Sequence, residues 1–354
     1  MMAAVGIVVF VAIGGYLVAR ELRVAQGDRS PAAATGTRSS PELPAPADSE
    51  SESSLGVPDV RGFNTGEPTL SKTLSGVVDS QLDEQAVRAR PAAGGPGVVV
   101  GSGHANWCDL FQFPDTASDR LAQALVGDVV RVRQHQGAWS EVESGDGVSW
   151  SGWIPTACVA RGQVRFMRQM TEGPWLVVVA APVLHTSSGN LPFGAVLPDV
   201  SEAGRSRVRL PDGRMVSVDS DGVRARGSIG LDEALKRARQ FLRAPYQRGA
   251  NTVEAMDAAG LVQLVFRIVG RTLPRAVDAL QRAGQNVPLN QMRAGDVIFF
   301  GTFDENHPHA VILLDGGTTF LEASPASGVN VGLVEQMRNR SIVAVRRYIS
   351  PPQS

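Results

Sequence analysis

Residues 256–262 read Met-Asp-Ala-Ala-Gly-Leu-Val, and the stretch continues to Arg267 as Gln-Leu-Val-Phe-Arg. Its apolar residues recur at helical spacing, so the stretch predicts a buried helix that follows Asp257. Aspartate is a residue type that caps helices, because its carboxylate accepts hydrogen bonds from the free N–H groups of the first turn. The rest of the chain is therefore interpreted around a helix that begins at Ala258.

The composition limits the classes of function. The chain has 354 residues, 43% of them hydrophobic, which is enough for two or three domains. Its 34 basic residues nearly balance its 35 acidic residues, so we expect no nucleic-acid partner. The 38 glycines and the low aromatic content of 6% favour short strands and turns over a helical bundle.

The N-terminal part differs from the rest in texture. Residues 1–26 begin with the apolar run MMAAVGIVVFVAIGGYLVA, which is long enough to span a bilayer and predicts a transmembrane anchor, with a cleaved signal peptide as the alternative. Residues 27–97 are rich in Ser, Pro, Ala, Gly, Asp and Glu and predict a disordered linker. Within the linker, residues 69–90 have spaced Leu and Val, which fits a partner-docking helix or a transient one.

Short apolar alternations cut by Gly and Asp follow in residues 98–162 and again in 163–227. This pattern predicts two small β-barrels, and Leu210-Pro-Asp-Gly213 predicts a hairpin turn in the latter segment. Residues 98–162 resemble a bacterial SH3-like domain through Gly127-Asp-Val-Val, Gly137-Ala-Trp139 and Gly152-Trp153-Ile, and residues 163–227 resemble another domain of this kind. Tryptophans in small barrels more often pack in the core than line a peptide groove, so we expect core packing for Trp139 and Trp153, with a peptide groove as the alternative.

The chain contains two cysteines, Cys108 and Cys158. They lie near the two ends of the first predicted barrel, where the termini of a small barrel come together. A disulfide is therefore plausible in an oxidising compartment, and two buried free thiols are the alternative.

Residues 228–350 have a mixed pattern that predicts an α+β domain, because helices come first and strands after. The first predicted helix starts at Ile229 and runs to Leu242, with acidic residues in its first turn and basic residues later. The next predicted helix follows Asp257. The predicted strands cover residues 295–300, 309–314, 318–323 and 342–348.

Six ordered motifs in this segment resemble the NlpC-type cell-wall cysteine peptidases. They are Phe241-Leu-Arg-Ala-Pro-Tyr246, Asp257-x-x-Gly260-Leu-Val, Leu273-Pro-Arg275, Arg293-Ala-Gly-Asp296-Val-Ile-Phe-Phe300, His309-Ala-Val-Ile-Leu-Leu and Val345-Arg-Arg-Tyr348. The resemblance covers about residues 98 to 350. It implies a papain-like NlpC-type domain preceded by two SH3-like barrels, with the architecture of γ-D-glutamyl–diaminoacyl endopeptidases, which trim peptidoglycan stem peptides. We expect no cofactor.

The resemblance also locates the catalytic positions. The family motif reads Asp-Cys-Ser-Gly-Leu-Val, so the nucleophile position is Ala258 and the neighbouring serine position is Ala259. An alanine methyl group cannot attack a carbonyl. By the same resemblance, His309 fills the base position and Glu322 the orienting position, where the family more often has His, Asn or Gln. Without a nucleophile, an ion pair between the two would simply join two strands.

The binding positions implied by the family are partly kept. Tyr246 and Asp257 match, and the aspartate either holds the free amine of a stem peptide or only caps the helix. Ala259 departs from the family serine, and Tyr-x-Trp-Gly-Gly has become Tyr246-Gln-Arg-Gly-Ala250. This change alters the wall of the cleft.

Other chemistry is less well supported by the sequence. Ser324 and Ser327 lie near Glu322, but on a loop after a strand and not at the start of a helix. His307 and His309, with Asp304 and Glu322 near them, are conceivable zinc ligands. Two histidines at this spacing usually have no metal partner, so we expect no metal.

The sequence therefore predicts a membrane-anchored protein of the cell envelope whose body lies in the periplasm or outside the cell. Arg20 and Arg23 follow the apolar run and alone would favour a cytoplasmic body, but the implied cell-wall substrate favours the outside. The NlpC-type domain would be a catalytically dead pseudoenzyme that binds a peptidoglycan stem peptide or an envelope protein. The alternatives are an active endopeptidase in which Ala258 replaces a cysteine, and a scaffold that recruits another hydrolase.

Overall fold

The computed structural model describes the chain from residue 89 to residue 349, except for five short gaps. The described ranges are 89–102, 106–180, 183–186, 189–301, 309–337 and 341–349. The predicted anchor, nearly all of the predicted linker, and the candidate zinc ligands Asp304 and His307 lie outside these ranges. Within them, no helix combines the length and apolar character needed to cross a membrane.

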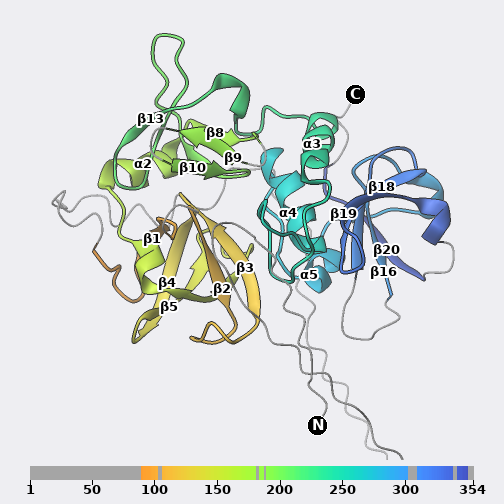
Figure 1. Ribbon diagram of the computed structural model, residues 1–354, viewed down its shortest axis with the longest axis horizontal. Helices are drawn as coiled ribbons and strands as arrows, with labels where there is room; N and C mark the ends of the chain where they lie inside the picture. The colour runs from red at the N-terminus through yellow and green to blue at the C-terminus, as the bar shows by residue number, and fades with distance from the viewer. Residues whose placement is uncertain are drawn as a thin grey trace, which may run out of the picture. The chain divides into compact units, whose positions relative to one another are not determined.

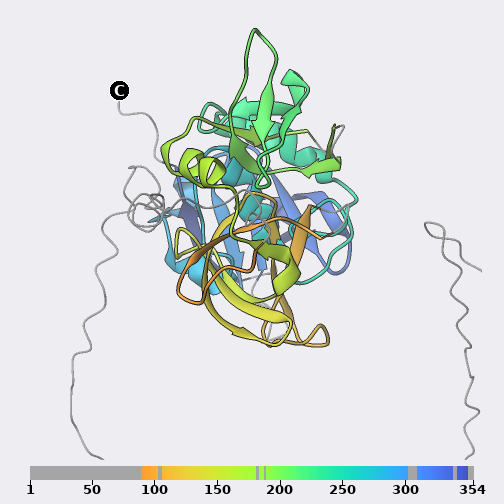
Figure 2. The ribbon, with the colours of Figure 1, turned by 90° about the vertical axis from the view of Figure 1, so that its left-hand side faces the viewer.

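The first part of the described chain is a seven-stranded antiparallel sheet with the order β3-β2-β6-β5-β4-β1-β7. Val132, Val142 and Ile154 are fully buried and alternate with exposed or half-buried neighbours, as strand geometry requires. The strands curl around the cluster that these residues form (Figure 2). The strands are β1 Pro96–Val99, β2 Trp107–Phe111, β3 Arg120–Leu125, β4 Val129–Gln136, β5 Trp139–Ser144, β6 Ser151–Pro155 and β7 Val159–Ala160.

A disulfide closes this sheet. Cys108, on β2, is bonded to Cys158, in the 3₁₀ turn Thr156–Cys158, and their Cα atoms are 6.3 Å apart. Both cysteines are buried and belong to the core of the sheet. The disulfide therefore joins β2 to the turn that leads into β7 through the interior of the sheet.

The expected core packing of Trp139 and Trp153 is wrong. Both side chains are half-buried, because their strand neighbours Ser140 and Ile154 take the fully buried positions and strand alternation turns the tryptophans outward. The ring of Trp139 packs edge-on against Phe111 at 5.7 Å. The sheet therefore carries an aromatic pair, Phe111 and Trp139, outside its buried core.

The second part contains one helix and three small antiparallel sheets. The predicted hairpin turn is confirmed, because β12 pairs with β13, the Leu210 N–H donates to the Arg214 carbonyl at 2.8 Å and Gly213 has a φ of +85°. The helix α2 was not predicted. The sheets have the orders β11-β8-β14, β10-β9 and β12-β13. The elements are α2 Val164–Glu172, β8 Trp175–Val178, β9 Val183–Thr186, β10 Gly189–Pro192, β11 Val196–Pro198, β12 Arg207–Arg209, β13 Met215–Ser217 and β14 Val223–Ala225.

The third part has the mixed helix and strand content that the sequence predicts. Three helices lie on one side of a six-stranded sheet with the order β15-β20-β16-β17-β18-β19 (Figure 1). The predicted first helix is shorter than expected, since it continues from α3 into a 3₁₀ turn at Arg239–Phe241. The elements are α3 Leu231–Ala238, α4 Ala258–Ile268, α5 Val277–Arg282, β15 Gln285–Asn286, β16 Val297–Phe300, β17 His309–Leu313, β18 Thr319–Ser324, β19 Gly328–Leu333 and β20 Ile342–Arg347.

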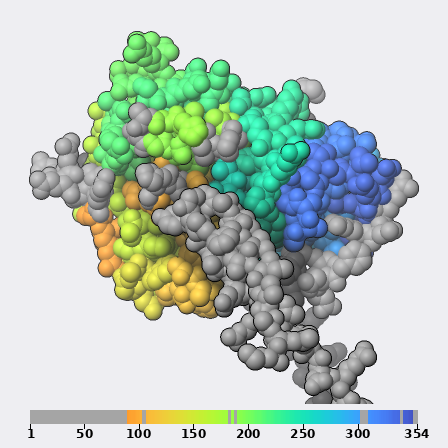
Figure 3. Space-filling model, in the orientation of Figure 1, coloured from red at the N-terminus to blue at the C-terminus, as the bar shows by residue number. Residues whose placement is uncertain are grey.

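Helix α4 lies at the centre of this third part. It packs against α3, β17 and β18, and every one of its residues except Arg267 is buried. Ala310 and Ile312 of β17 belong to the cluster that includes α4, whereas Val311 and Leu313 belong to a separate cluster. The unpredicted strand β19 is an edge strand of the sheet. The last part of the described chain forms the blue surface in Figure 3.

We predict that the disulfide stabilises the first sheet by about 2–4 kcal/mol, the range for cross-links that close loops of this size. The loop spans 50 residues, and its closure restricts the unfolded chain. Urea denaturation with and without a reductant, followed by tryptophan fluorescence, measures the difference. The double variant Cys108→Ala/Cys158→Ala is the control, because a reductant has no other cysteine to act on. Equal midpoints for the oxidised and reduced protein would contradict this prediction.

Candidate functional site

The site begins at the N-terminus of α4. Asp257 is the N-cap, and its Oδ1 accepts a hydrogen bond from the Gly260 N–H at 2.7 Å. Ala258 is the first residue of the helix, and the side chains of Ala258 and Ala259 are buried. A thiol at position 258 would lie at the positive end of the helix dipole, where a thiolate is favoured. The methyl group that occupies this place carries no charge and no nucleophile.

The second oxygen of Asp257 holds two further groups. Oδ2 accepts a hydrogen bond from the Gly249 N–H at 2.7 Å and lies 2.8 Å from Nη2 of Arg275. The side chains of Arg275 and Asp257 are 8% and 9% exposed, so this is a buried ion pair. A buried carboxylate needs such partners. The sequence showed Arg275 only as part of a motif and gave no sign of this role.

Two glycines allow the backbone to approach the cap closely. Gly260 has no Cβ, and a Cβ there would lie 2.3 Å from the Ala250 carbonyl oxygen. Gly249 has a φ of +77°, and its Cβ would lie 2.3 Å from the carbonyl oxygen of Arg120. Both distances are far below contact, so any larger residue would push the loop away. The Asp-x-x-Gly spacing is thus explained by a cap and a close backbone approach.

The altered loop, residues 246–251, is held from the other side by the first sheet. Gln123 Oε1 accepts a hydrogen bond from the Asn251 N–H at 2.9 Å, and the guanidinium of Arg120 donates to the Arg248 carbonyl at 3.3 Å. Strand β3 therefore fixes the wall of the site. These residues were not predicted, because partners 128 positions apart leave no local pattern.

Tyr246 begins this loop and is half-buried. Burial raises the pKa of its phenol, and the negative charge of Asp257 raises it further. The phenol is therefore neutral at physiological pH and can donate a hydrogen bond. Among the described residues it has no hydrogen-bond partner of its own. Its backbone lies beside Met256, just before the cap.

His309 and Glu322 are in contact, as the sequence predicts. His309 opens β17, and its Nε2 is 2.9 Å from Oε2 of Glu322 on β18. Because a carboxylate accepts hydrogen bonds, Nε2 is the donor in this contact and Nδ1 is left for another partner. Both side chains are largely buried, at 16% and 12% exposure. The pair lies on the two strands that pack against α4.

Asn330 extends this pair onto the third strand. Its Nδ2 donates to Oε1 of Glu322 at 3.2 Å and also to Ser327 Oγ, whose partner is Ser324 at 2.8 Å. The sequence did not predict Asn330, because the strand that carries it was not predicted. In the β18–β19 register Asn330 lies opposite Glu322. Both serines bond within this network, and among the described residues neither contacts His309.

The other predicted residues lie elsewhere. Cys108 and Cys158 are in the first sheet and form a disulfide, so the chain, which has two cysteines, has no free thiol. Within the described ranges, no three side chains of His, Cys, Asp or Glu are grouped to hold a metal. Tyr246, Asp257, Ala258, Ala259, His309 and Glu322 all belong to the third part of the chain.

Comparison with known proteins agrees with this architecture. Residues 243–347 match the model of the NlpC/P60 family. The chain is similar to the gamma-D-glutamyl-L-lysine dipeptidyl-peptidase of Bacillus subtilis, with 28% identity over 64% of this chain and 81% of that protein. It is also similar to the peptidoglycan endopeptidase RipB of Mycobacterium tuberculosis, with 32% identity over 30% of this chain and 48% of that protein. The chain thus spans about half of RipB.

A solved structure extends the likeness beyond the matched segment. The crystal structure of an NlpC/P60 family protein from Bacillus cereus superposes with a TM-score of 0.61 and 18% identity, over 72% of this chain and all of that one. At this identity the likeness concerns the fold alone. Residues 243–347 form an NlpC/P60 domain. The family is one of peptidases, and its fold is that of a cysteine peptidase.

We predict that Asp257→Ala lowers the stability of the NlpC/P60 domain by about 3–5 kcal/mol, because it leaves the Arg275 guanidinium buried and unpaired. Urea denaturation measures the loss. The control is Asp278→Ala, which breaks an exposed ion pair with Arg282 on α5 and should cost less than about 1 kcal/mol. If both variants lose the same small amount, Asp257 does not organise the site.

Proposed function

We propose that this protein is a membrane-tethered protein of the cell envelope whose NlpC/P60 domain binds peptidoglycan stem peptide and does not cleave it. The observation that carries the proposal is the methyl group of Ala258 at the N-terminus of α4, where the peptidases of this fold need a thiolate. The frame around that position is complete, since the cap, the buried ion pair and the His309–Glu322 pair are all formed.

Neither the two cysteines nor the two serines near Glu322 offer an equivalent nucleophile. The two cysteines of the chain are joined to each other. Ser324 and Ser327 hydrogen-bond to each other, and neither lies at a helix N-terminus. A serine hydroxyl also needs an adjacent base to become nucleophilic, and within the described residues neither serine contacts His309.

Recognition of a stem peptide rests on the wall of the site. The neutral phenol of Tyr246 has an unused donor among the described residues, and the loop behind it is held in place by Gln123 and Arg120. Asp257 contributes less than the sequence suggested, because Gly249, Gly260 and Arg275 already use both of its oxygens. We therefore propose that Asp257 holds the site together and that Tyr246 contacts the ligand. A relative named for a gamma-D-glutamyl-L-lysine substrate supports the choice of ligand.

We extend the proposal to the domain organisation and the location. Residues 98–162 and 163–227 are two SH3-like domains, residues 228–350 are a papain-like NlpC-type domain, and residues 1–26 and 27–97 are the anchor and its linker. The curled seven-stranded sheet supports the first assignment. The disulfide is typical of proteins in oxidising compartments and supports a periplasmic or extracellular body.

The second candidate function is an active γ-D-glutamyl–diaminoacyl endopeptidase, with Ala258 in place of a native cysteine. The His309–Glu322 contact favours it, because Nε2 is bonded to the orienting carboxylate and Nδ1 is left to take a proton. A scaffold that recruits another hydrolase is a third candidate. It requires no ligand at the site.

We predict that the unmodified full-length protein releases no product from peptidoglycan fragments. The variant Ala258→Cys should cleave them on the order of a thousandfold or more above the uncatalysed background, since loss of a nucleophile costs at least that factor. Mass spectrometry of digested muropeptides measures both. The control Ala258→Cys/His309→Ala should be inactive again. Hydrolysis by the unmodified protein would refute the proposed function. An inert Ala258→Cys variant would show that the His309–Glu322 pair cannot activate a thiol at position 258.

We predict that a stem tripeptide containing γ-D-glutamyl-L-lysine binds the full-length protein in calorimetric titration, and that Tyr246→Phe weakens binding about three- to tenfold. One hydrogen bond accounts for a loss of this size. Tyr348→Phe is the matched control, because its hydroxyl bonds to the Leu280 carbonyl and its loss should affect stability alone. The absence of any binding would favour the scaffold instead.

A further inference from the structure

A cavity of about 80 Å³ lies where the three parts of the described chain meet. This volume holds a few water molecules and is far below the roughly 300 Å³ or more of pockets that enclose larger ligands. None of the residues at the N-terminus of α4 lines it, and neither does His309. The lining residues that carry the argument are Asp128, Asp146, Arg226, Arg267, Arg271 and Thr272.

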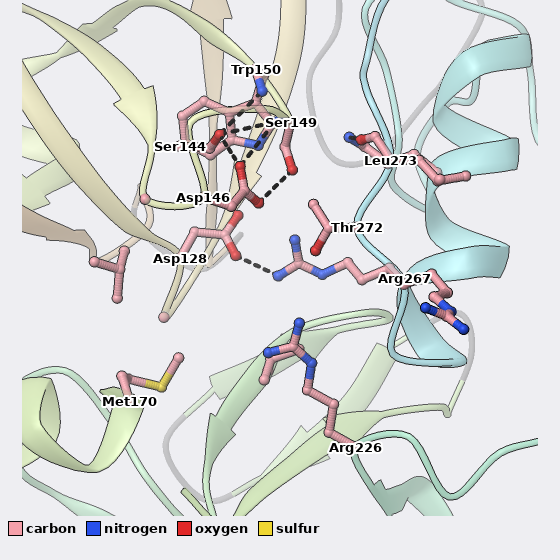
Figure 4. A pocket seen from close by; sticks show the side chains of 16 residues that line it. Asp128, Ser144, Asp146, Ser149, Trp150, Met170, Arg226, Arg267, Thr272 and Leu273 are labelled. Carbon is pink, nitrogen blue, oxygen red and sulfur yellow. Dashed lines mark hydrogen bonds and ion pairs between the residues drawn. The ribbon is translucent and has the colours of Figure 1, made fainter. Parts of the chain in front are cut away.

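Arg226, directly after β14, is the unusual member of this set. Its guanidinium lies over the ring of Trp175, 5.6 Å from the ring centre, and points toward Arg267 across the cavity (Figure 4). Among the described residues, the guanidinium forms no hydrogen bond and no ion pair. Burial lowers its pKa, and the charge of Arg267 lowers it further, while Asp146 and Asp128 act in the opposite direction. Its charge is therefore poorly compensated.

The two carboxylates of the cavity are already satisfied by other groups. Asp128 forms an ion pair with Arg267 and accepts a hydrogen bond from the Leu125 N–H at 2.9 Å. Asp146 accepts hydrogen bonds from the hydroxyls of Ser144 and Ser149 at 2.6 and 2.7 Å. Burial opposes its ionisation, but these bonds outweigh burial and hold the pKa of Asp146 below its ordinary value. Neither carboxylate is within ion-pair distance of Arg226.

Arg271 adds a second cation to the lining, also without a side-chain partner among the described residues. After the Asp128–Arg267 pair is set aside, the charges left in the lining are the cations Arg226 and Arg271 and the carboxylate of Asp146. Arg267 stands in the last turn of α4 and offsets the negative end of the helix dipole. The cavity therefore has a net positive charge, free guanidinium donors and the hydroxyl of Thr272.

We propose that Arg226, together with Arg271, binds a small oxyanion in this cavity, that is, a carboxylate or a phosphate group. A guanidinium presents paired N–H donors that match both kinds of anion. The volume admits the anionic group itself and not a peptide or a sugar ring. This site is separate from the N-terminus of α4 and independent of the proposed function.

Calorimetric titration of the full-length protein with inorganic phosphate and with acetate, each against chloride at equal ionic strength, tests the proposal. We expect one saturable site per chain for at least one of the two anions. Binding of phosphate alone assigns the site to phosphate groups, binding of acetate alone to carboxylates, and binding of both to anionic charge. The absence of saturable binding by either anion would overturn the proposal.

Three variants locate the site. Arg226→Gln and Arg271→Gln should each weaken binding about tenfold or more, since hydrogen bonds to charged groups are strong. Arg168→Gln removes an exposed arginine on α2 and should bind like the natural protein. Among the described residues Arg226 has no ion pair to lose, only its contact with the Trp175 ring, so its variant should lower the melting temperature by no more than a few degrees without added anion. Unchanged binding by Arg226→Gln would overturn the assignment. If Arg226→Gln does not fold, unchanged binding by Arg271→Gln would overturn it instead.

Discussion

The carboxylate of Asp257 is the constraint on which the site depends. It is buried, and a buried charge is tolerated only where hydrogen bonds and an opposite charge surround it. Its two oxygens therefore bring together the first turn of α4 through Gly260, the loop through Gly249 and the later segment through Arg275. Three separate segments are fixed at one point, and this point adjoins the position that would carry the nucleophile.

The fold around the site does not depend on which side chain occupies the nucleophile position. Ala258 and Ala259 follow the cap, and alanine is the residue that most favours a helix. Their methyl groups are buried and carry no polar atom that would need a partner. Alanine at both positions therefore places no strain on α4. The chain can keep the fold of a peptidase without the group that attacks, because the fold rests on Asp257 and Arg275 and not on the nucleophile.

The sequence predicted those features of the fold and the site that follow from local patterns or from the family resemblance. The helix after Asp257, the strands of His309 and Glu322 and the hairpin at Leu210 follow from periodicity and turn chemistry. The partners Arg275 and Gln123 could not be predicted, because their contacts depend on tertiary packing between separate segments. Asn330 was missed because its strand, β19, was not predicted. The error at Trp139 and Trp153 has a different cause. The size of a tryptophan suggests a core position, but the alternation of the strand had assigned that position to a neighbour.

Helix α4 is also held at its far end. Arg267 pairs with Asp128 and donates to the Gly194 carbonyl at 2.6 Å, about 14 Å along the axis from Ala258 at roughly 1.5 Å per residue. Ion pairs therefore fix both ends of a helix that is buried over nearly its whole surface. In so constrained a frame the backbone at position 258 cannot shift to present another side chain to a peptide bond. The neighbours of Ala258 therefore keep their places, and a thiol introduced there would lie at the N-terminus of a helix that is already fixed at both ends.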